Sequence, residues 1–225
     1  MKGSDQRSDP SASEQDSSVA AEPRWPALVA ALAVAGIYGA LPPSLSAGPR
    51  WLALVITAVL LVPSVLTHRS GRHHWNRIVG YCITGVLTAF MIWSLVLLVR
   101  ALPAHKESPI ALLRSGATLW ISNVLVFALW YWRLDAGGPY SRGLRPGHTE
   151  GAFLFPQMTM SAHLRKERWS PMFIDYLFLA FNTSTALSPT DVPILSRWAK
   201  IMVMIQALIS LTVTVILVSR AVNIL

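Results

Sequence analysis

The sequence predicts an all-α, polytopic transmembrane protein with five spanning helices and a short re-entrant helix before the last span. Three observations lead to this prediction. Hydrophobic residues make up 53% of the chain and charged residues 13%, whereas a soluble domain has about 25% charged residues. Five apolar runs each reach the roughly 17 residues that a spanning helix needs at minimum. Most of the tryptophans lie near the ends of these runs, as in the aromatic belts of membrane proteins.

The N-terminal half predicts a polar tail followed by three transmembrane helices. Residues 1–24 are rich in Ser, Asp, Glu and Gln and have no apolar periodicity, which predicts a disordered tail. No basic region precedes a short apolar core, so this tail is not expected to be a signal peptide. Residues 25–102 then predict three spans, at 25–41, 51–67 and 78–102.

The C-terminal half, residues 109–225, predicts an outer helix, a cap, a short helix and a last span. The outer helix covers 109–133, and the cap covers the turn-rich and partly apolar stretch 134–171. The short helix at 172–183 has about 12 residues and is therefore roughly 18 Å long. A hydrocarbon core is roughly 30 Å thick, so this helix is too short to span it. We therefore expect a re-entrant helix and turn over 172–191, followed by a helix over 198–222.

The order of these elements resembles the pore module of the tetrameric potassium-channel superfamily. The filter pattern of that superfamily is Thr-x-x-Thr/Ser-Val-Gly-Tyr-Gly-Asp. With Asp191 placed on the aspartate of that pattern, the corresponding turn consists of Thr183, Ser184, Thr185, Ala186, Leu187, Ser188, Pro189, Thr190 and Asp191. The resemblance implies a homotetramer in which four turns surround a central pore that passes monovalent cations.

The turn departs from that pattern at three positions. Ser188 and Thr190 replace the two filter glycines, and Pro189 replaces the tyrosine. Glycine allows the positive φ angles that such a filter uses, whereas proline fixes φ near −65°. We therefore expect a glycine-free filter that passes cations with weak selectivity. The alternative is a non-conducting membrane scaffold, or a docking protein for a partner or lipid, on a channel-like fold.

A second resemblance covers the C-terminal half. The stretches WYWRLDAGGP (130–139), FLFPQM (153–158) and FNTSTALSPTD (181–191) are similar to those of a family of bacterial integral membrane proteins whose activity is unassigned. This resemblance implies a location in the bacterial plasma (inner) membrane.

Polar residues recur along the last span. Gln206, Ser210 and Thr214 are spaced by four and therefore share one helical face. They predict either a pore wall or a seam of interhelical hydrogen bonds. Asp191 predicts either a ring of carboxylates at a pore mouth or a capping residue. At the end of the fourth span, Arg133 and Asp135 predict a solvated charge pair.

The distribution of basic residues leaves the orientation open. Most Lys and Arg residues lie in the tail, the loop between the second and third spans, and the region between the fourth and fifth spans. The positive-inside rule places these segments, and with them the turn, in the cytoplasm. The channel resemblance implies the opposite, because the turn of that module faces outward.

The composition and the absence of several known motifs exclude some classes of function. The net charge of +8 fits contact with anionic lipid, and we expect no nucleic-acid partner. The single cysteine, Cys82, excludes an intramolecular disulfide and a cysteine metal cluster. The sequence has no zinc-protease, nucleophile-elbow, P-loop or dinucleotide motif. We therefore expect no enzymatic activity, no metal and no cofactor.

Overall fold

The structure is a computed structural model that describes residues 24–46, 48–69, 73–104, 108–143, 151–160, 169–185 and 191–222. Its elements are α1 (Trp25–Tyr38), η2 (Pro43–Leu45), α2 (Leu52–Arg69), α3 (His73–Ala104), α4 (Pro109–Leu134), η3 (Asp135–Gly137), α5 (Pro139–Gly143), α6 (Pro156–Thr159), α7 (Phe173–Thr185) and α8 (Arg197–Val222). The prediction of an all-helical protein is confirmed. Within these ranges the only extended pairing is an isolated antiparallel bridge between Phe153 and Ile194.

Three helices are long and apolar enough to cross a membrane. They cover His74–Leu102, Pro109–Gly137 and Arg197–Val222. The first two predicted spans correspond to shorter apolar helices, Trp25–Tyr38 and Leu52–Pro63. A helix of 14 residues such as α1 is only about 21 Å long. Length and composition alone therefore assign three membrane spans among the described residues, rather than five.

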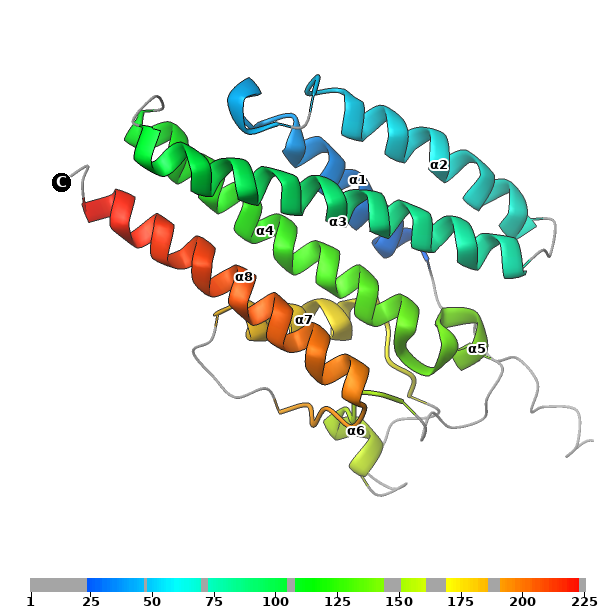
Figure 1. Cartoon of the computed structure of the whole chain (residues 1–225). Helices are drawn as coiled ribbons and strands as arrows, with labels where there is room; N and C mark the ends of the chain where they lie inside the picture. The colour runs from blue at the N-terminus through cyan, green and yellow to red at the C-terminus, as the bar shows by residue number, and fades with distance from the viewer. Residues whose placement is uncertain are drawn as a thin grey trace, which may run out of the picture.

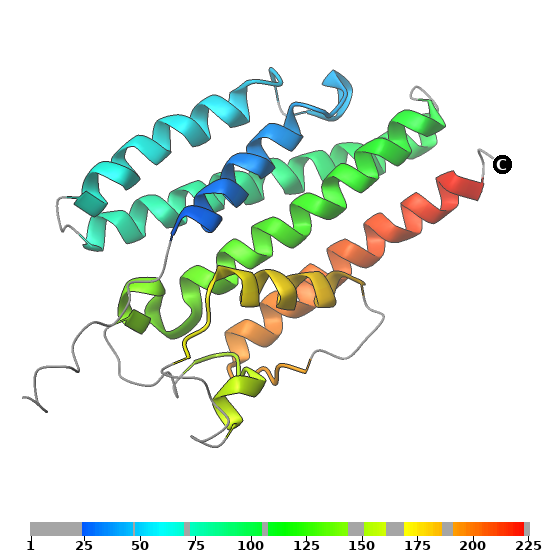
Figure 2. The ribbon, with the colours of Figure 1, turned by 180° about the vertical axis from the view of Figure 1, so that it is seen from behind.

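Helix α4 lies at the centre of the bundle (Figures 1 and 2) and packs against α1, α3, α7 and α8. Its start has a local cause, because Ser108 Oγ accepts a hydrogen bond from the backbone N–H of Ala111 at 3.2 Å and Pro109 occupies the first turn. Its end is followed by Gly137 and Gly138, whose φ angles of 81° and 94° favour glycine. Helix α4 thus connects the N-terminal helices to α7 and α8.

The helix ends fall at two opposite ends of the bundle. The starts of α1, α3 and α8 and the ends of α2 and α4 lie at the end where α5 is found (Figures 1 and 2), which we call the cap end. Arg24, Arg77, Arg133 and Arg142 belong to the cap end. Arg220 lies at the other end, where its Nη2 donates to the carbonyl oxygen of Leu102 at 3.2 Å.

Close packing joins α4 to α8 near the end opposite the cap. A Cβ built on Gly116 of α4 would lie 2.8 Å from Cδ2 of Leu217 on α8. The absence of a side chain at Gly116 therefore lets Leu217 approach the α4 backbone. This contact and the α4–α7 contact hold α7 and α8 on the same flank of α4 (Figure 2).

Candidate functional site

The start of α7 is fixed by a buried polar cluster at the cap end. The hydroxyl of Tyr176 donates to Oδ2 of Asp135 at 2.6 Å, and the N–H of Ala152 donates to Oδ1 at 2.6 Å. Nη1 of Arg142 donates to the carbonyl oxygens of Trp132 at 2.8 Å and Asp135 at 3.0 Å. The prediction of a solvated Arg133–Asp135 pair is therefore wrong, because Asp135 is fully buried.

Arg142 also contacts α7 directly. Its guanidinium lies 5.0 Å from the ring centroid of Tyr176, in a cation–π contact. Only 2% of the surface of Arg142 is exposed. Sequence reasoning missed this residue, since an arginine in the turn-rich stretch after the fourth span carries no local signal of burial.

The first turn of α7 has its own cap. Oδ2 of Asp175 accepts a hydrogen bond from the backbone N–H of Met172 at 2.7 Å. Partial burial raises the pKa of the Asp175 carboxyl above its ordinary value, and the hydrogen bond from Met172 opposes this rise. Asp175 therefore orients the start of α7, and the partial removal of its carboxylate from water costs free energy.

The end of α7 is bonded to the middle of α8. Nε2 of Gln206 donates to the carbonyl oxygen of Ala180 at 2.7 Å and to Oγ of Ser184 at 2.8 Å. The hydroxyl of Ser210 donates to the carbonyl oxygen of Ser184. The last carbonyl groups of a helix have no partner within the helix, so these side chains provide partners where water is scarce.

Helix α4 completes the cluster. Nδ2 of Asn123 donates to the carbonyl oxygen of Gln206 at 3.2 Å and lies 3.5 Å from Oγ of Ser184. The hydroxyl of Tyr131 donates to Oε1 of Gln206 at 2.5 Å. Asn123, Tyr131 and Gln206 are all fully buried. Oδ1 of Asn123 has no hydrogen-bond partner within the described part of the chain.

The structure separates the three polar residues of the last span. Gln206 and Ser210 are buried against α7, whereas Thr214 is exposed. The side-chain amide of Gln206 bonds to Ala180 and Ser184 of α7 and to Tyr131 of α4. The proposed pore-wall role of these three residues stays a prediction.

The predicted turn is described in part. Thr183 and Ser184 are buried in the last turn of α7, and Oγ1 of Thr183 donates to the carbonyl oxygen of Leu179 at 2.9 Å. Oγ1 of Thr185 donates to the carbonyl oxygen of Asn182 at 3.0 Å. Asp191 is exposed. The remaining five predicted filter residues, Ala186, Leu187, Ser188, Pro189 and Thr190, lie outside the described residues.

After this gap the chain is again at the cap end. The N–H of Leu154 donates to the carbonyl oxygen of Pro193 at 2.9 Å, and the N–H of Leu195 donates to that of Ala152 at 2.8 Å. Phe153, between them, packs on the rings of Tyr176 at the start of α7 and Trp198 at the start of α8. The start of α7 and residues 193–195 therefore lie against the same segment, 151–155.

The chain matches no protein-family model, no curated protein and no solved structure. The channel-like and bacterial-family resemblances therefore rest on the quoted residues alone.

Proposed function

We propose that the protein is a subunit of an ion-channel-like assembly in the bacterial plasma membrane, in which four chains surround a cation-permeable pore with a glycine-free filter. In this proposal α7 is a re-entrant helix, and α1 and α2 add two short spans to the three long ones. The observation that carries the proposal is the placement of α7 and of residues 193–195. Helix α7 begins at the cap end and reaches the middle of α4 and α8 at Ser184, and Pro193 again lies at the cap end.

The direction of α7 supports a site for cations. The C-terminal end of a helix carries a partial negative charge, equivalent to about half an elementary charge. The bonds from Gln206 and Ser210 hold this end of α7 in one position at the middle of the bundle. In four chains related by a fourfold axis, four such ends would point toward the axis and favour a cation there.

The free surface of α8 supports assembly. The exposed large apolar residues of α8 are Trp198, Ile201, Met204, Ile205, Leu208, Leu211, Val215, Val218 and Val222. Such a surface must face either lipid or another chain. In this proposal one edge of it packs against neighbouring copies, Thr214 lies on the pore side, and Gln206 and Ser210 position α7 rather than line the pore.

A specific observation favours the alternative of a non-conducting scaffold or docking protein. The side-chain hydrogen bonds of Gln206 and Ser210 are made to α4 and α7 in the same chain. Interhelical hydrogen bonding alone accounts for such residues in a membrane protein. The two functions differ in whether the assembled protein moves ions.

The first test is the stoichiometry of the purified protein in nanodiscs, measured by native mass spectrometry. The proposal requires a tetramer, because a single chain supplies one turn to the axis. Tetramers are then reconstituted in liposomes, and K⁺ and Na⁺ flux is measured for the parent, Asp191→Ala and Pro189→Gly. We expect Asp191→Ala to reduce cation flux. A monomer or dimer contradicts the pore, and a tetramer that moves no ion at any voltage or pH supports the scaffold.

A further inference from the structure

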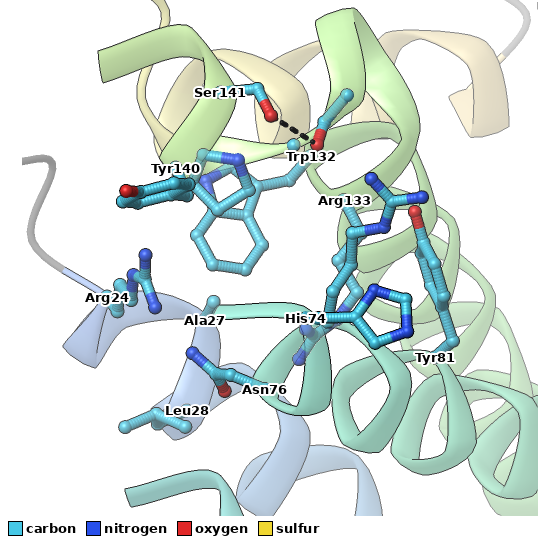
Figure 3. Close-up of a pocket in the computed structure, with 14 residues that line it drawn as sticks. Arg24, Ala27, Leu28, His74, Asn76, Tyr81, Trp132, Arg133, Tyr140 and Ser141 are labelled. Carbon is cyan, nitrogen blue, oxygen red and sulfur yellow. Dashed lines mark hydrogen bonds between the residues drawn. The ribbon is translucent and has the colours of Figure 1, made fainter. Parts of the chain in front are cut away.

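A basic cavity lies at the cap end, away from the α7–α8 cluster (Figure 3). Its volume is about 160 Å³, and α1, α3, α4 and the segment 137–141 line it. Four basic side chains contribute to the lining, Arg24, His74, Arg77 and Arg133, and no Asp or Glu is among the lining residues that the structure describes. A cavity with this lining attracts anions.

Whereas His74 and Arg77 are exposed, Arg133 is half-buried. Its Nε is buried and has no hydrogen-bond partner in the ranges that the structure covers. Its guanidinium lies 5.4 Å from the ring centroid of Trp132, and Figure 3 shows it next to Tyr81. A buried guanidinium nitrogen without an acceptor is costly, and an anion in the cavity would relieve that cost.

Gly80 on α3 makes room for Arg133. A Cβ on Gly80 would lie 1.9 Å from Nη1 and 2.7 Å from Cζ of Arg133. Any larger residue at position 80 would therefore push the guanidinium out of its place without removing its charge. A substitution of Gly80 would therefore displace Arg133 without changing the charges of the residues that line the cavity.

The guanidinium groups in the lining are suited to binding a phosphate group. The guanidinium groups of Arg77 on α3 and Arg133 on α4 both border the cavity, and an anion between them would offset their like-charge repulsion. The planar fork of arginine matches the oxygens of phosphate and can donate two parallel hydrogen bonds. The cavity also lies where helices begin and end, which is the depth of lipid headgroups for a membrane-spanning bundle.

We propose that this cavity binds a phosphate group, carried either by an anionic lipid headgroup or by a small soluble phosphate compound. Arg133 and Arg77 would donate to its oxygens, and Gly80 would set the position of Arg133. The proposal does not depend on whether the protein conducts ions.

Native mass spectrometry of the full chain in a non-ionic detergent tests the proposal. The probes are phosphatidylglycerol, phosphatidylcholine and inorganic phosphate. The variants are Arg133→Gln, which removes the charge, and Gly80→Ala, which keeps it but displaces the guanidinium. Arg114→Gln is the matched control, because Arg114 is an exposed arginine of the same helix far from the cavity. Thermal unfolding of each variant establishes that it is folded.

We expect the parent and Arg114→Gln to retain phosphatidylglycerol, and both cavity variants to bind it about tenfold more weakly, which is the loss of roughly one charge-assisted hydrogen bond. If excess inorganic phosphate displaces the lipid through the cavity, the occupant is a soluble phosphate compound. If it does not, the occupant is a lipid. The proposal is overturned if Arg133→Gln and Gly80→Ala bind like the parent, if phosphatidylcholine binds equally well, or if the parent retains neither anionic probe.

Discussion

Gln206 of α8 donates from Nε2 to the carbonyl oxygen of Ala180 in α7 across 2.7 Å. The two residues are fully buried, so the bond holds the end of a short helix at the middle of the bundle without help from water. The same amide accepts a hydrogen bond from Tyr131 of α4 at 2.5 Å. One side chain thus joins the three helices that form the candidate site.

Replacing Gln206 by leucine should weaken this junction. The change leaves the hydroxyl of Tyr131 and the oxygens of Ala180 and Ser184 without their partner, and we expect a loss of about 1–3 kcal/mol in the free energy of unfolding. The measurement is thermal unfolding in detergent, monitored by tryptophan fluorescence. Thr214→Val is the control on the same helix, because Thr214 is exposed. Equal melting temperatures for Gln206→Leu and the control would contradict the positioning role.

The Tyr176 hydroxyl should matter more than other tyrosine hydroxyls at the cap end. Tyr176→Phe removes the 2.6 Å bond to the buried Asp135 carboxyl, and the lost bond to such a group corresponds to about 1.5–3 kcal/mol. Tyr140→Phe is the matched control, since Tyr140 is 42% exposed. Chemical denaturation of both variants measures the difference. A larger loss for Tyr140→Phe than for Tyr176→Phe would show that the cluster around Asp135 does not anchor α7.

The same substitution should have different effects on stability at two glycines. An alanine at position 116 would place its Cβ 2.8 Å from Leu217, whereas no atom lies within 4 Å of a Cβ at Gly85. Overpacking costs about 1–3 kcal/mol, and the better helix propensity of alanine contributes up to about 1 kcal/mol. We expect Gly116→Ala to lower the melting temperature and Gly85→Ala to keep or raise it. Identical shifts in the two variants would mean that α4 and α8 separate easily at Gly116.

The stability of the protein should carry a pH dependence from Asp175. Burial raises the pKa of this carboxyl in the folded state, so the unfolded chain loses its proton first as the pH rises. Between the ordinary carboxyl pKa of about 4 and the raised pKa, the unfolded state binds fewer protons and stability falls. The cost is then fully present above the raised pKa and absent below the ordinary one.

Asp175→Asn should remove that dependence, because the amide oxygen can still accept the hydrogen bond from Met172. The melting temperature of the variant should rise relative to that of the parent as the pH increases. The measurement runs from about pH 3.5 to about pH 7, a range that begins below the ordinary carboxyl pKa of about 4. If the melting temperature of the parent instead rose relative to that of the variant over this range, the hydrogen bond from Met172 to the carboxylate would outweigh the desolvation of the carboxylate.

Much of the helix pattern could be predicted from local sequence. The fourth span was predicted at 109–133 and is found at Pro109–Leu134, and the last helix was predicted at 198–222 and is found at Arg197–Val222. The short helix predicted at 172–183 is found at Phe173–Thr185. These bounds follow from apolar runs that end at prolines, glycines and charged residues, and such signals act over a few residues.

The predictions that failed or stayed open depend on distant contacts. Asp135 was predicted to be solvated because it follows an arginine at a helix end, but Tyr176, which is 41 residues away, bonds to it in the interior. Among the described residues, three helices meet both the length and the hydropathy needed for a span, and α1 is too short because it ends at Tyr38. Whether Thr214 lines a pore depends on other chains, and a single sequence carries no direct record of that contact.

The sequence by itself determined the membrane character of this protein, its helical class and the half-length helix before the last span, because composition and hydrophobic periodicity act locally along the chain. Only the tertiary structure decided where Gln206 donates, that Asp135 and Arg142 are buried, and that Arg24, Arg77 and Arg133 share a cavity. The physical reason is that burial and hydrogen bonding are set by side chains that packing brings together from separate helices.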